Sequence, residues 1–283
     1  MLRSGLVTLA AALALSACTG APATSSATTA PASGSPAASA PTPAVAAPTT
    51  PSPAAPLPTI RADTRPLAGR TIVVDPGHNG VWTRALLRQV PAGNGRTKAC
   101  NASGTASNAG YPEHAFTWDV AIRLRTALRR LGATVVLTRP NDQGSGPCVN
   151  VRAAITNKAK ADLLVSIHAD GSFAAGARGF HVIVSTTMAG GARVEQRSLA
   201  FAKVVRHAIE TGTGMPRSTY IGAGTGLSPR SDIAGLNLSQ RVGVMVEFGN
   251  MRSAADLKLL GSAAWRQRAA AALAAACVTT LAR

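Results

Sequence analysis

The chain has 283 residues, of which 46% are hydrophobic and 4% aromatic, and it carries a net charge of +17. This length allows one or two domains. A positive charge of this size first suggests nucleic acid as a partner, but the basic residues are scattered and aromatic residues are few. The composition therefore argues against a nucleic-acid-binding protein, and an anionic polymer or a membrane surface is the expected partner.

The first 60 residues differ in composition from the rest. Residues 1–17 combine a basic residue at position 3 with an apolar stretch over 6–15, which is typical of a secretory signal peptide and too short to span a membrane. Residues 15–18, LSAC, resemble the lipobox of bacterial lipoproteins, which predicts cleavage before Cys18 and acylation of this cysteine. The alternative is ordinary cleavage at another position.

Residues 19–60 contain ten prolines and no charged residue. Such a segment buries too little apolar surface to offset the entropy of ordering it. We therefore expect residues 18–60 to be a lipidated cysteine followed by a disordered tether. The protein is predicted to be exported and held at the outer face of the cytoplasmic membrane, with part of it secreted as an alternative.

Residues 61–283 alternate between apolar, strand-like runs and segments with helical periodicity. Strands are expected at 71–75, 133–138, 162–167, 179–184 and 242–248. Helices are expected at 113–131, 151–160, 195–210 and 254–281. Two glycine-rich stretches, 79–110 and 211–240, show no clear periodicity. The alternation predicts a single α/β domain with a mostly parallel, twisted sheet that is flanked by helices on both faces.

Two of the predicted strands end at histidines, and a glutamate opens the helix between them. His78 and His168 follow the strands at 71–75 and 162–167, and Glu113 begins the helix. Taken alone, each histidine is more typical of a hydrogen-bonding loop residue, and Glu113 of an acidic first-turn residue. The carboxyl ends of parallel strands share one sheet edge, so we expect the three to meet there. Two imidazoles and a carboxylate would bind one Zn²⁺ and leave its fourth position open, as in catalytic zinc sites.

A further acidic residue, Glu247, lies near the end of the buried strand predicted at 242–248. A carboxylate at this place is costly unless its charge is used. It either forms an ion pair at the sheet edge or accepts a proton from water at the metal. Asp75 either orients an imidazole or caps its own turn. His114 would point about 100° away from Glu113 around the helix, so we expect a surface or cleft-wall residue.

Four segments in this order resemble the zinc-dependent N-acetylmuramoyl-L-alanine amidases, which are peptidoglycan hydrolases of the cell-division and sporulation type. They are residues 75–78 (DPGH), Glu113, residues 166–170 (SIHAD) and residues 246–249 (VEFG). The similarity extends over essentially all of residues 70–280. The resemblance implies that His78, Glu113 and His168 bind one Zn²⁺ and that Glu247 is the catalytic acid and base. It also implies that the substrate is peptidoglycan or a muropeptide, cleaved between N-acetylmuramic acid and L-alanine.

Two departures from the family pattern concern the surroundings of this site. Thirty-four residues separate His78 from Glu113, where relatives usually have a short glycine-rich link. We expect the excess to form a loop over the cleft that Cys100 holds in place. Residues 249–253 read GNMRS instead of the more usual GFISN, which leaves open how this segment contacts the substrate.

Three cysteines follow residue 60, and no two of them have the C-x-x-C spacing of a metal cluster. Cys100 and Cys148 lie in polar, glycine-containing loops before helices, so we expect them to form a disulfide in an oxidising compartment. Cys277 lies in the alanine-rich C-terminal helix and is expected to be a buried free thiol.

Two other functions stay open at this point. A zinc carboxypeptidase of wall peptides would use the same metal and base on a different bond. A non-catalytic wall-binding lipoprotein would share the fold, although the presence of all three ligands and Glu247 argues against it. We expect a monomer, and neither an autoinhibitory element nor an activator protein is evident from the sequence.

Overall fold

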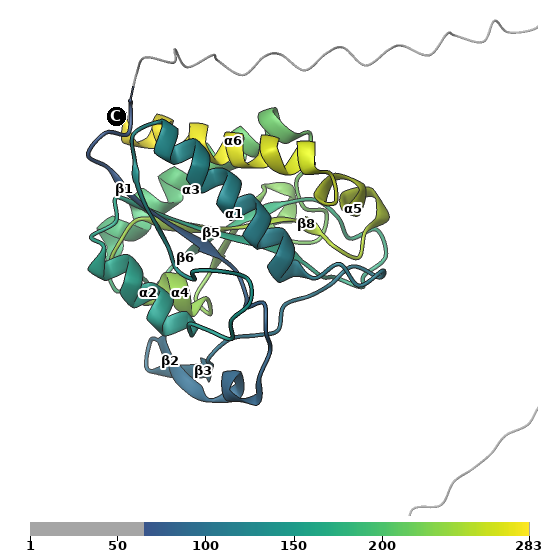
Figure 1. The fold of residues 1–283 in the computed structure, drawn as a ribbon, viewed down its shortest axis with the longest axis horizontal. Helices are drawn as coiled ribbons and strands as arrows, with labels where there is room; N and C mark the ends of the chain where they lie inside the picture. Colours follow the sequence, from purple (N-terminus) through teal and green to yellow (C-terminus); the bar gives the residue numbers. More distant parts are fainter. Residues whose placement is uncertain (1–64, 283) are drawn as a thin grey trace, which may run out of the picture. The chain divides into compact units, whose positions relative to one another are not determined.

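The computed structural model describes residues 65–282, which form a six-stranded sheet between two layers of helices (Figure 1). The strands lie in the order β4 (Thr134–Leu137), β1 (Thr71–Pro76), β5 (Leu163–Asp170), β8 (Gly243–Asn250), β6 (His181–Ser185) and β7 (Leu227–Arg230). All neighbouring pairs are parallel except β6 and β8, which are antiparallel. The predicted α/β fold with a mostly parallel sheet is confirmed.

The helices divide between the two faces of the sheet, as predicted. The first face is covered by α1 (Glu113–Arg130), α3 (Ala192–Thr213) and α6 (Ala263–Leu281), and α2 (Val149–Lys158) and α4 (Ala234–Asn237) lie on the other. Because successive side chains of a strand point to opposite faces, Ile72 and Val74 enter the large core under α1 and α6, and Val73 enters a smaller core on the opposite face.

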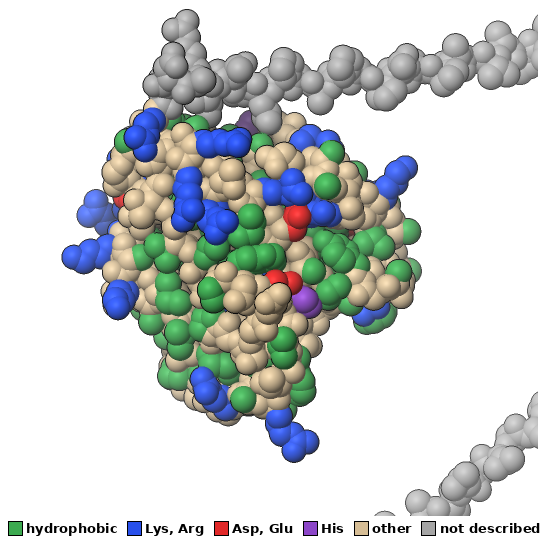
Figure 2. All heavy atoms as spheres, in the orientation of Figure 1, with side chains coloured by type: hydrophobic (Ala, Val, Ile, Leu, Met, Phe, Trp, Pro, Cys, Tyr) green, Lys and Arg blue, Asp and Glu red, His purple; other side chains and the backbone are tan. Residues whose placement is uncertain are grey.

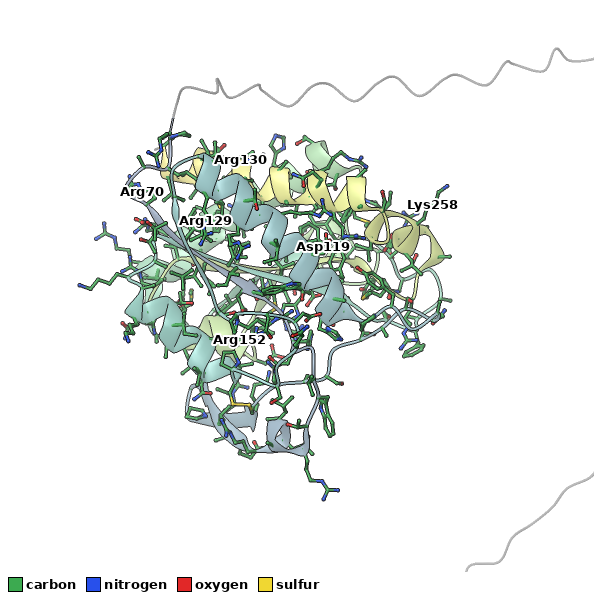
Figure 3. The ribbon with its side chains drawn as sticks, in the orientation of Figure 1. Arg70, Asp119, Arg129, Arg130, Arg152 and Lys258 are labelled. Atoms are coloured by element: carbon green, nitrogen blue, oxygen red, sulfur yellow. A yellow bond between two sulfur atoms is a disulfide. The ribbon has the colours of Figure 1, made fainter. Side chains whose placement is uncertain are left out.

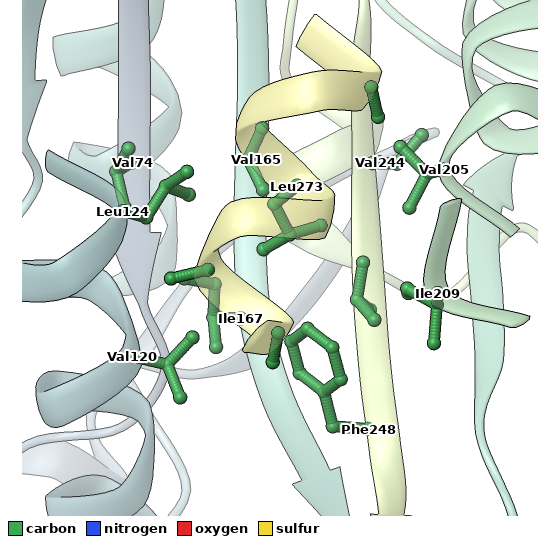
Figure 4. Close-up of a cluster of buried hydrophobic side chains, with 14 of the residues drawn as sticks. Val74, Val120, Leu124, Val165, Ile167, Val205, Ile209, Val244, Phe248 and Leu273 are labelled. Carbon is green, nitrogen blue, oxygen red and sulfur yellow. The ribbon is translucent and has the colours of Figure 1, made fainter. Parts of the chain in front are cut away.

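Figure 4 shows part of the large core, where Val120 and Leu124 of α1 and Leu273 of α6 lie over the strand side chains. These residues are almost completely removed from water, and burial of each such side chain contributes about 1.5–3 kcal/mol. Pro112 precedes the first turn of α1, and Gly132, with a φ of 98°, follows its end. The buried face of α1 thus fixes where its first residue, Glu113, meets the sheet.

The segment 79–110 contains structure that the periodicity does not reveal. After a 3₁₀ turn at Arg84–Leu87, β2 (Gln89–Gly93) and β3 (Arg96–Ala99) form an antiparallel hairpin. Asn94 and Gly95 connect the strands, and both have positive φ values, which is typical of a tight hairpin turn. The predicted disulfide is present: Cys100, directly after β3, is bonded to Cys148 at the start of α2.

Two further predictions of secondary structure were incomplete. The single C-terminal helix expected at 254–281 is in fact two helices, α5 (Ala254–Leu260) and α6, separated by Gly261 and Ser262. The Ser262 side chain accepts a hydrogen bond from the Trp265 backbone and so caps α6. The stretch 211–240 contains β7, α4 and a 3₁₀ turn at Gly222–Gly224. Cys277 is a buried free cysteine, as expected.

The signal peptide, Cys18, the tether and the domain boundary at residue 61 lie outside the described residues. Among residues 65–282, we find no helix with the length and apolar composition needed to cross a membrane.

Candidate metal centre

Three side chains meet where β1 and β5 end and α1 begins. The possible ligand atoms of His78, Glu113 and His168 all lie within 4.8 Å of one another. His78 Nε2 and His168 Nδ1 are 3.1 Å apart, and each lies 3.0 Å from a different oxygen of the Glu113 carboxylate. The structure thus brings together the three residues that the motifs indicate. Their role as metal ligands stays a prediction.

Close packing and one hydrogen bond orient the two imidazoles. His78 Nδ1 lies 3.0 Å from the carbonyl oxygen of Ala102. A neutral His78 that donates its Nδ1 proton to this carbonyl presents an unprotonated Nε2 to Glu113 and His168. Gly77 lies directly against the His168 ring, and a Cβ at this position would come within 2.3 Å of it. Glycine at 77 therefore allows the β1 turn to approach His168.

The Glu113 carboxylate is buried and has four close neighbours. Its Oε1 accepts a hydrogen bond from the Ala169 backbone and its Oε2 one from the Thr105 backbone, both at 3.0 Å. Burial raises the pKa of Glu113, but His78 and His168 together outweigh this effect and hold its pKa well below the usual range. Burial likewise lowers the pKa of His78, and the Glu113 charge outweighs it, so this pKa is raised. Glu113 is thus an ionised, buried group that requires a positive partner.

Glu247 lies beside this group on the next strand. In β8 it is in register with His168 of β5 and with His181 of β6. Residues in register point to the same face of a sheet, and Glu247 lines the same cavity as the three possible ligands. Its Oε2 is buried and has no hydrogen-bond partner among the described residues. Burial, followed by the charges of Glu113 and Asp170, raises the pKa of Glu247 well above the usual range.

Asp75 takes neither of the two roles proposed from the sequence. Its carboxylate accepts hydrogen bonds from Ser166, Thr138 and Arg152, and these bonds neither reach an imidazole nor cap the turn. Arg152 of α2, labelled in Figure 3, continues from Asp75 to the carbonyl oxygens of Pro76 and His78. Burial raises the pKa of Asp75, but Arg152 and the two hydroxyl groups outweigh this effect and lower it to about 2. This ion pair therefore supports the backbone turn that presents His78.

The site opens into a cavity of about 810 Å³. Its lining includes Lys98 of β3, Gly104 of the segment that follows the hairpin, residues of α4, and Arg252. The segment between His78 and Glu113 therefore borders the cleft, as expected, and the disulfide fixes it at Cys100.

The remaining histidines of the described region lie outside the three-ligand group. His114 Nδ1 is 2.9 Å from Asp142 Oδ2, so its position agrees with the expected cleft-wall or surface role. His181 is buried in β6 beside Glu247, and burial lowers its pKa to about 4. The sequence contains no signal that His181 lies next to Glu247, because this contact results from the antiparallel pairing of β6 and β8.

Arg152 was also missed in the sequence analysis, since an arginine in a helix is usually exposed.

These features define a class of protein: an α/β domain with a candidate metal centre and a buried carboxylate at the carboxyl edge of its sheet. Within this class, the chain belongs to the N-acetylmuramoyl-L-alanine amidase family, whose profile matches residues 72–278. The resemblance to the N-acetylmuramoyl-L-alanine amidases is therefore confirmed as to the family.

The relatives cover most of the described region. The chain is 47% identical over 207 residues to N-acetylmuramoyl-L-alanine amidase Rv3717 of Mycobacterium tuberculosis, which covers 73% of this chain and 84% of that protein. It is also similar to the crystal structure of the amidase Ami1 from Mycobacterium smegmatis, with 46% identity and a TM-score of 0.72 over 76% of this chain and 98% of that one. The apo form of Ami1 from Mycobacterium abscessus gives 45% identity and a TM-score of 0.72, over 76% and 100% of the two chains.

The contact between Gly104 and the site predicts a specific loss of metal binding. Gly104 has a φ of 81°, and a Cβ there would lie 2.8 Å from His78 Cγ and 3.0 Å from Glu113 Oε2. Gly110 has a φ of 87°, and a Cβ added there would meet no atom within 4 Å. Gly110→Ala therefore introduces the same kind of backbone strain as Gly104→Ala but no contact with the site. We expect Gly104→Ala to weaken Zn²⁺ binding roughly tenfold or more and Gly110→Ala to leave it unchanged. Titration against a chromophoric chelator measures both, and equal affinities of the two variants would contradict the geometry.

The Asp75–Arg152 pair predicts a defined acid sensitivity. Because the pKa of folded Asp75 is lowered from 3.8 to about 2, its stabilising contribution is complete above pH 4 and is lost as the pH falls through 2. The unfolding free energy of the wild type should fall by about 2 kcal/mol from this group alone. Asp75→Asn should be less stable at neutral pH, because it leaves Arg152 unpaired, and should lack this part of the acid dependence. Urea unfolding from pH 7 to pH 2 tests this, and identical pH profiles of the two proteins would refute it.

Proposed function

We propose that this chain is a zinc-dependent N-acetylmuramoyl-L-alanine amidase. It hydrolyses the amide between N-acetylmuramic acid and the L-alanine of the stem peptide, in peptidoglycan or in soluble muropeptides. The observation that carries the proposal is the group formed by His78, Glu113 and His168, with Glu247 beside it, in a chain of the amidase family.

The donor set fits one zinc ion. Two imidazole nitrogens and one carboxylate are typical ligands of catalytic zinc, and they leave a fourth position for water or substrate. The low pKa of Glu113 means that this ligand is already ionised before a cation binds. When bound, zinc would lower the pKa of water to about 7 and polarise the scissile carbonyl.

Glu247 would carry the proton. It accepts a proton from the attacking water, and it then donates this proton to the departing amine of L-alanine. The burial and the neighbouring charges that raise its pKa suit both steps, since a more basic carboxylate removes the water proton more readily and still protonates an amine. Proton transfer of this kind contributes about 10²–10⁴ in rate.

The residues around the site would hold these groups in place. The Asp75–Arg152 pair fixes the turn at His78, and the backbone N–H groups of Thr105 and Ala169 fix the Glu113 carboxylate. These contacts are present without a substrate, so the arrangement is organised before the reaction begins.

We also propose that the enzyme works in the cell envelope, as an exported monomeric lipoprotein anchored through Cys18. Two features support this location: the lipobox-like segment at 15–18 and the disulfide between Cys100 and Cys148, a bond that persists in oxidising compartments. The basic side chains spread over the face in Figure 2, several of them above α1, suit an anionic envelope surface.

The assigned base predicts a variant that keeps its metal and loses its activity. Glu247→Gln removes the proton acceptor but none of the three ligands, so zinc content should stay at about one ion per chain while the rate falls by about 10²–10⁴. Glu210→Gln is the matched control, since Glu210 forms surface ion pairs on α3, and it should cleave as fast as the wild type. Both variants are compared by mass spectrometry of digested peptidoglycan.

The products of the same digest test the bond that is cleaved. An amidase releases stem peptides that begin with a free L-alanine amine, whereas a wall-peptide carboxypeptidase releases D-alanine. Release of D-alanine without free stem peptides would contradict the proposed reaction. A Glu247→Gln variant with wild-type activity would contradict the assignment of the base.

A further inference from the structure

Arg252 lies at the edge of the cavity, in the segment where the sequence departs from the family pattern. It follows the C-terminal end of β8 and lines the same cavity as His78, Glu113, His168 and Glu247. It also lines a smaller adjoining cavity of about 280 Å³. A side chain at this boundary is in a position to contact a substrate that extends beyond the metal centre.

Local contacts hold the Arg252 guanidinium in one orientation. Its Nη1 donates a hydrogen bond of 3.0 Å to Asn108 Oδ1, and its carbon Cζ lies 4.6 Å from the ring centroid of Phe173. Its backbone N–H donates to Asn250 Oδ1 at 3.0 Å, and the Asn250 amide is itself bonded to the carbonyl oxygens of Ser172 and Ala177. The side chain is therefore ordered before any ligand binds, which reduces the entropy cost of binding.

Arg252 nevertheless lacks an acidic partner. No carboxylate of residues 65–282 lies within 4 Å of its nitrogens, and its Nε is buried without a hydrogen-bond partner. The other arginine of the main cavity, Arg152, is paired with Asp75, and Arg178 of the smaller cavity is paired with Asp256. Asp170, which lines the main cavity, is bonded to the Tyr220 hydroxyl at 2.7 Å. Arg252 thus lines both cavities without a carboxylate to neutralise its charge.

We propose that Arg252 binds a carboxylate of the stem peptide, on the amine side of the scissile bond. This inference rests on the proposed amidase function. A guanidinium binds a carboxylate through two parallel hydrogen bonds. On the glycan side of the substrate, the lactyl carboxyl is consumed in the scissile amide and the sugars are neutral. The stem peptide carries the free carboxylates, so an unpaired cation beside the metal centre marks the peptide side of the cleft.

The proposal assigns a direction to the cleft. With the scissile amide at the three ligands and Glu247, the peptide runs toward Arg252 and Phe173, and the glycan extends from the other side of the scissile amide. A carboxylate on the second residue of the peptide, where amidation converts it to a neutral carboxamide, is the nearest anion to the cleaved bond. Arg252 would therefore distinguish amidated from non-amidated walls.

Two soluble substrates that differ by one group test this directly. N-acetylmuramoyl-L-alanyl-D-glutamate carries the α-carboxylate of its second residue, N-acetylmuramoyl-L-alanyl-D-isoglutamine carries a carboxamide in its place, and the γ-carboxylate is free in both. The zinc-loaded wild type should show roughly tenfold higher kcat/KM for the carboxylate substrate, mainly through a lower KM. Arg252→Met should abolish this preference with little change for the carboxamide, and Arg252→Lys should retain part of it.

Two controls separate this role from a general effect of charge. Arg129→Met removes an exposed arginine of α1 (Figure 3) and should keep the full preference. Lys98→Met removes another cation of the cavity lining and should also keep the preference. Zinc content and circular dichroism are recorded for every variant. If Arg252→Met does not fold, the substrate preference of Arg252→Lys is compared with that of the wild type instead.

The proposal is overturned if the wild type cleaves both substrates equally, if Arg252→Met keeps the preference, or if Lys98→Met alone abolishes it. A failure of the amidase function gives a different result, because the zinc-loaded wild type would then release L-alanine-terminated peptides neither from these substrates nor from peptidoglycan.

Discussion

The arrangement of the site depends on one buried negative charge, the carboxylate of Glu113. Helix α1 places it at the sheet edge because the apolar face of the helix packs into the large core over the strands and Glu113 is its first residue. Two backbone N–H groups and two imidazoles then surround its oxygens. A buried carboxylate is costly unless it is compensated, and here the compensation comes from groups on the turn after β1, on β5 and on the segment before α1. The contacts of this one carboxylate therefore link parts of the chain that are distant in sequence.

A second buried group, the ion pair of Asp75 and Arg152, stabilises the turn that carries His78. The Asp75–Arg152 pair joins β1 to α2, and Arg152 also binds the carbonyl oxygen of His78. The disulfide at Cys148 fixes the start of the same helix. Because α2 is held at both places, the turn that carries His78 is fixed to the helix by two independent links.

Much of this could be predicted from the sequence, because it depends on local patterns. Apolar runs that end in histidine indicate buried strands with ligands at their carboxyl ends, and the helix periodicity after Glu113 places that residue on the same edge. The sequence could not reveal the direction of β6, because periodicity is the same in parallel and antiparallel strands. The β2–β3 hairpin was missed because β3 is almost entirely exposed, although Asn94-Gly95 is a hairpin-turn signal.

Other features depend on partners that are far away in the chain. The burial of Arg152 results from Asp75, which is 77 residues before it, and no local pattern contains this information. The same holds for Arg252, whose significance follows from the absence of an acidic partner among residues 65–282 and from its place at the boundary of two cavities. The break between α5 and α6 does have a local signal, Gly261 and Ser262. The high alanine content of the segment obscures this signal, because it favours one continuous helix.

Anomalous diffraction at the zinc absorption edge can show whether His78, Glu113 and His168 form one preorganised zinc site. We expect a single anomalous peak per chain, about 2.0–2.2 Å from His78 Nε2, His168 Nδ1 and a Glu113 oxygen, with the three side chains close to their present positions. A zinc-loaded crystal with no peak at this place, or with the peak bound to other residues, would contradict it.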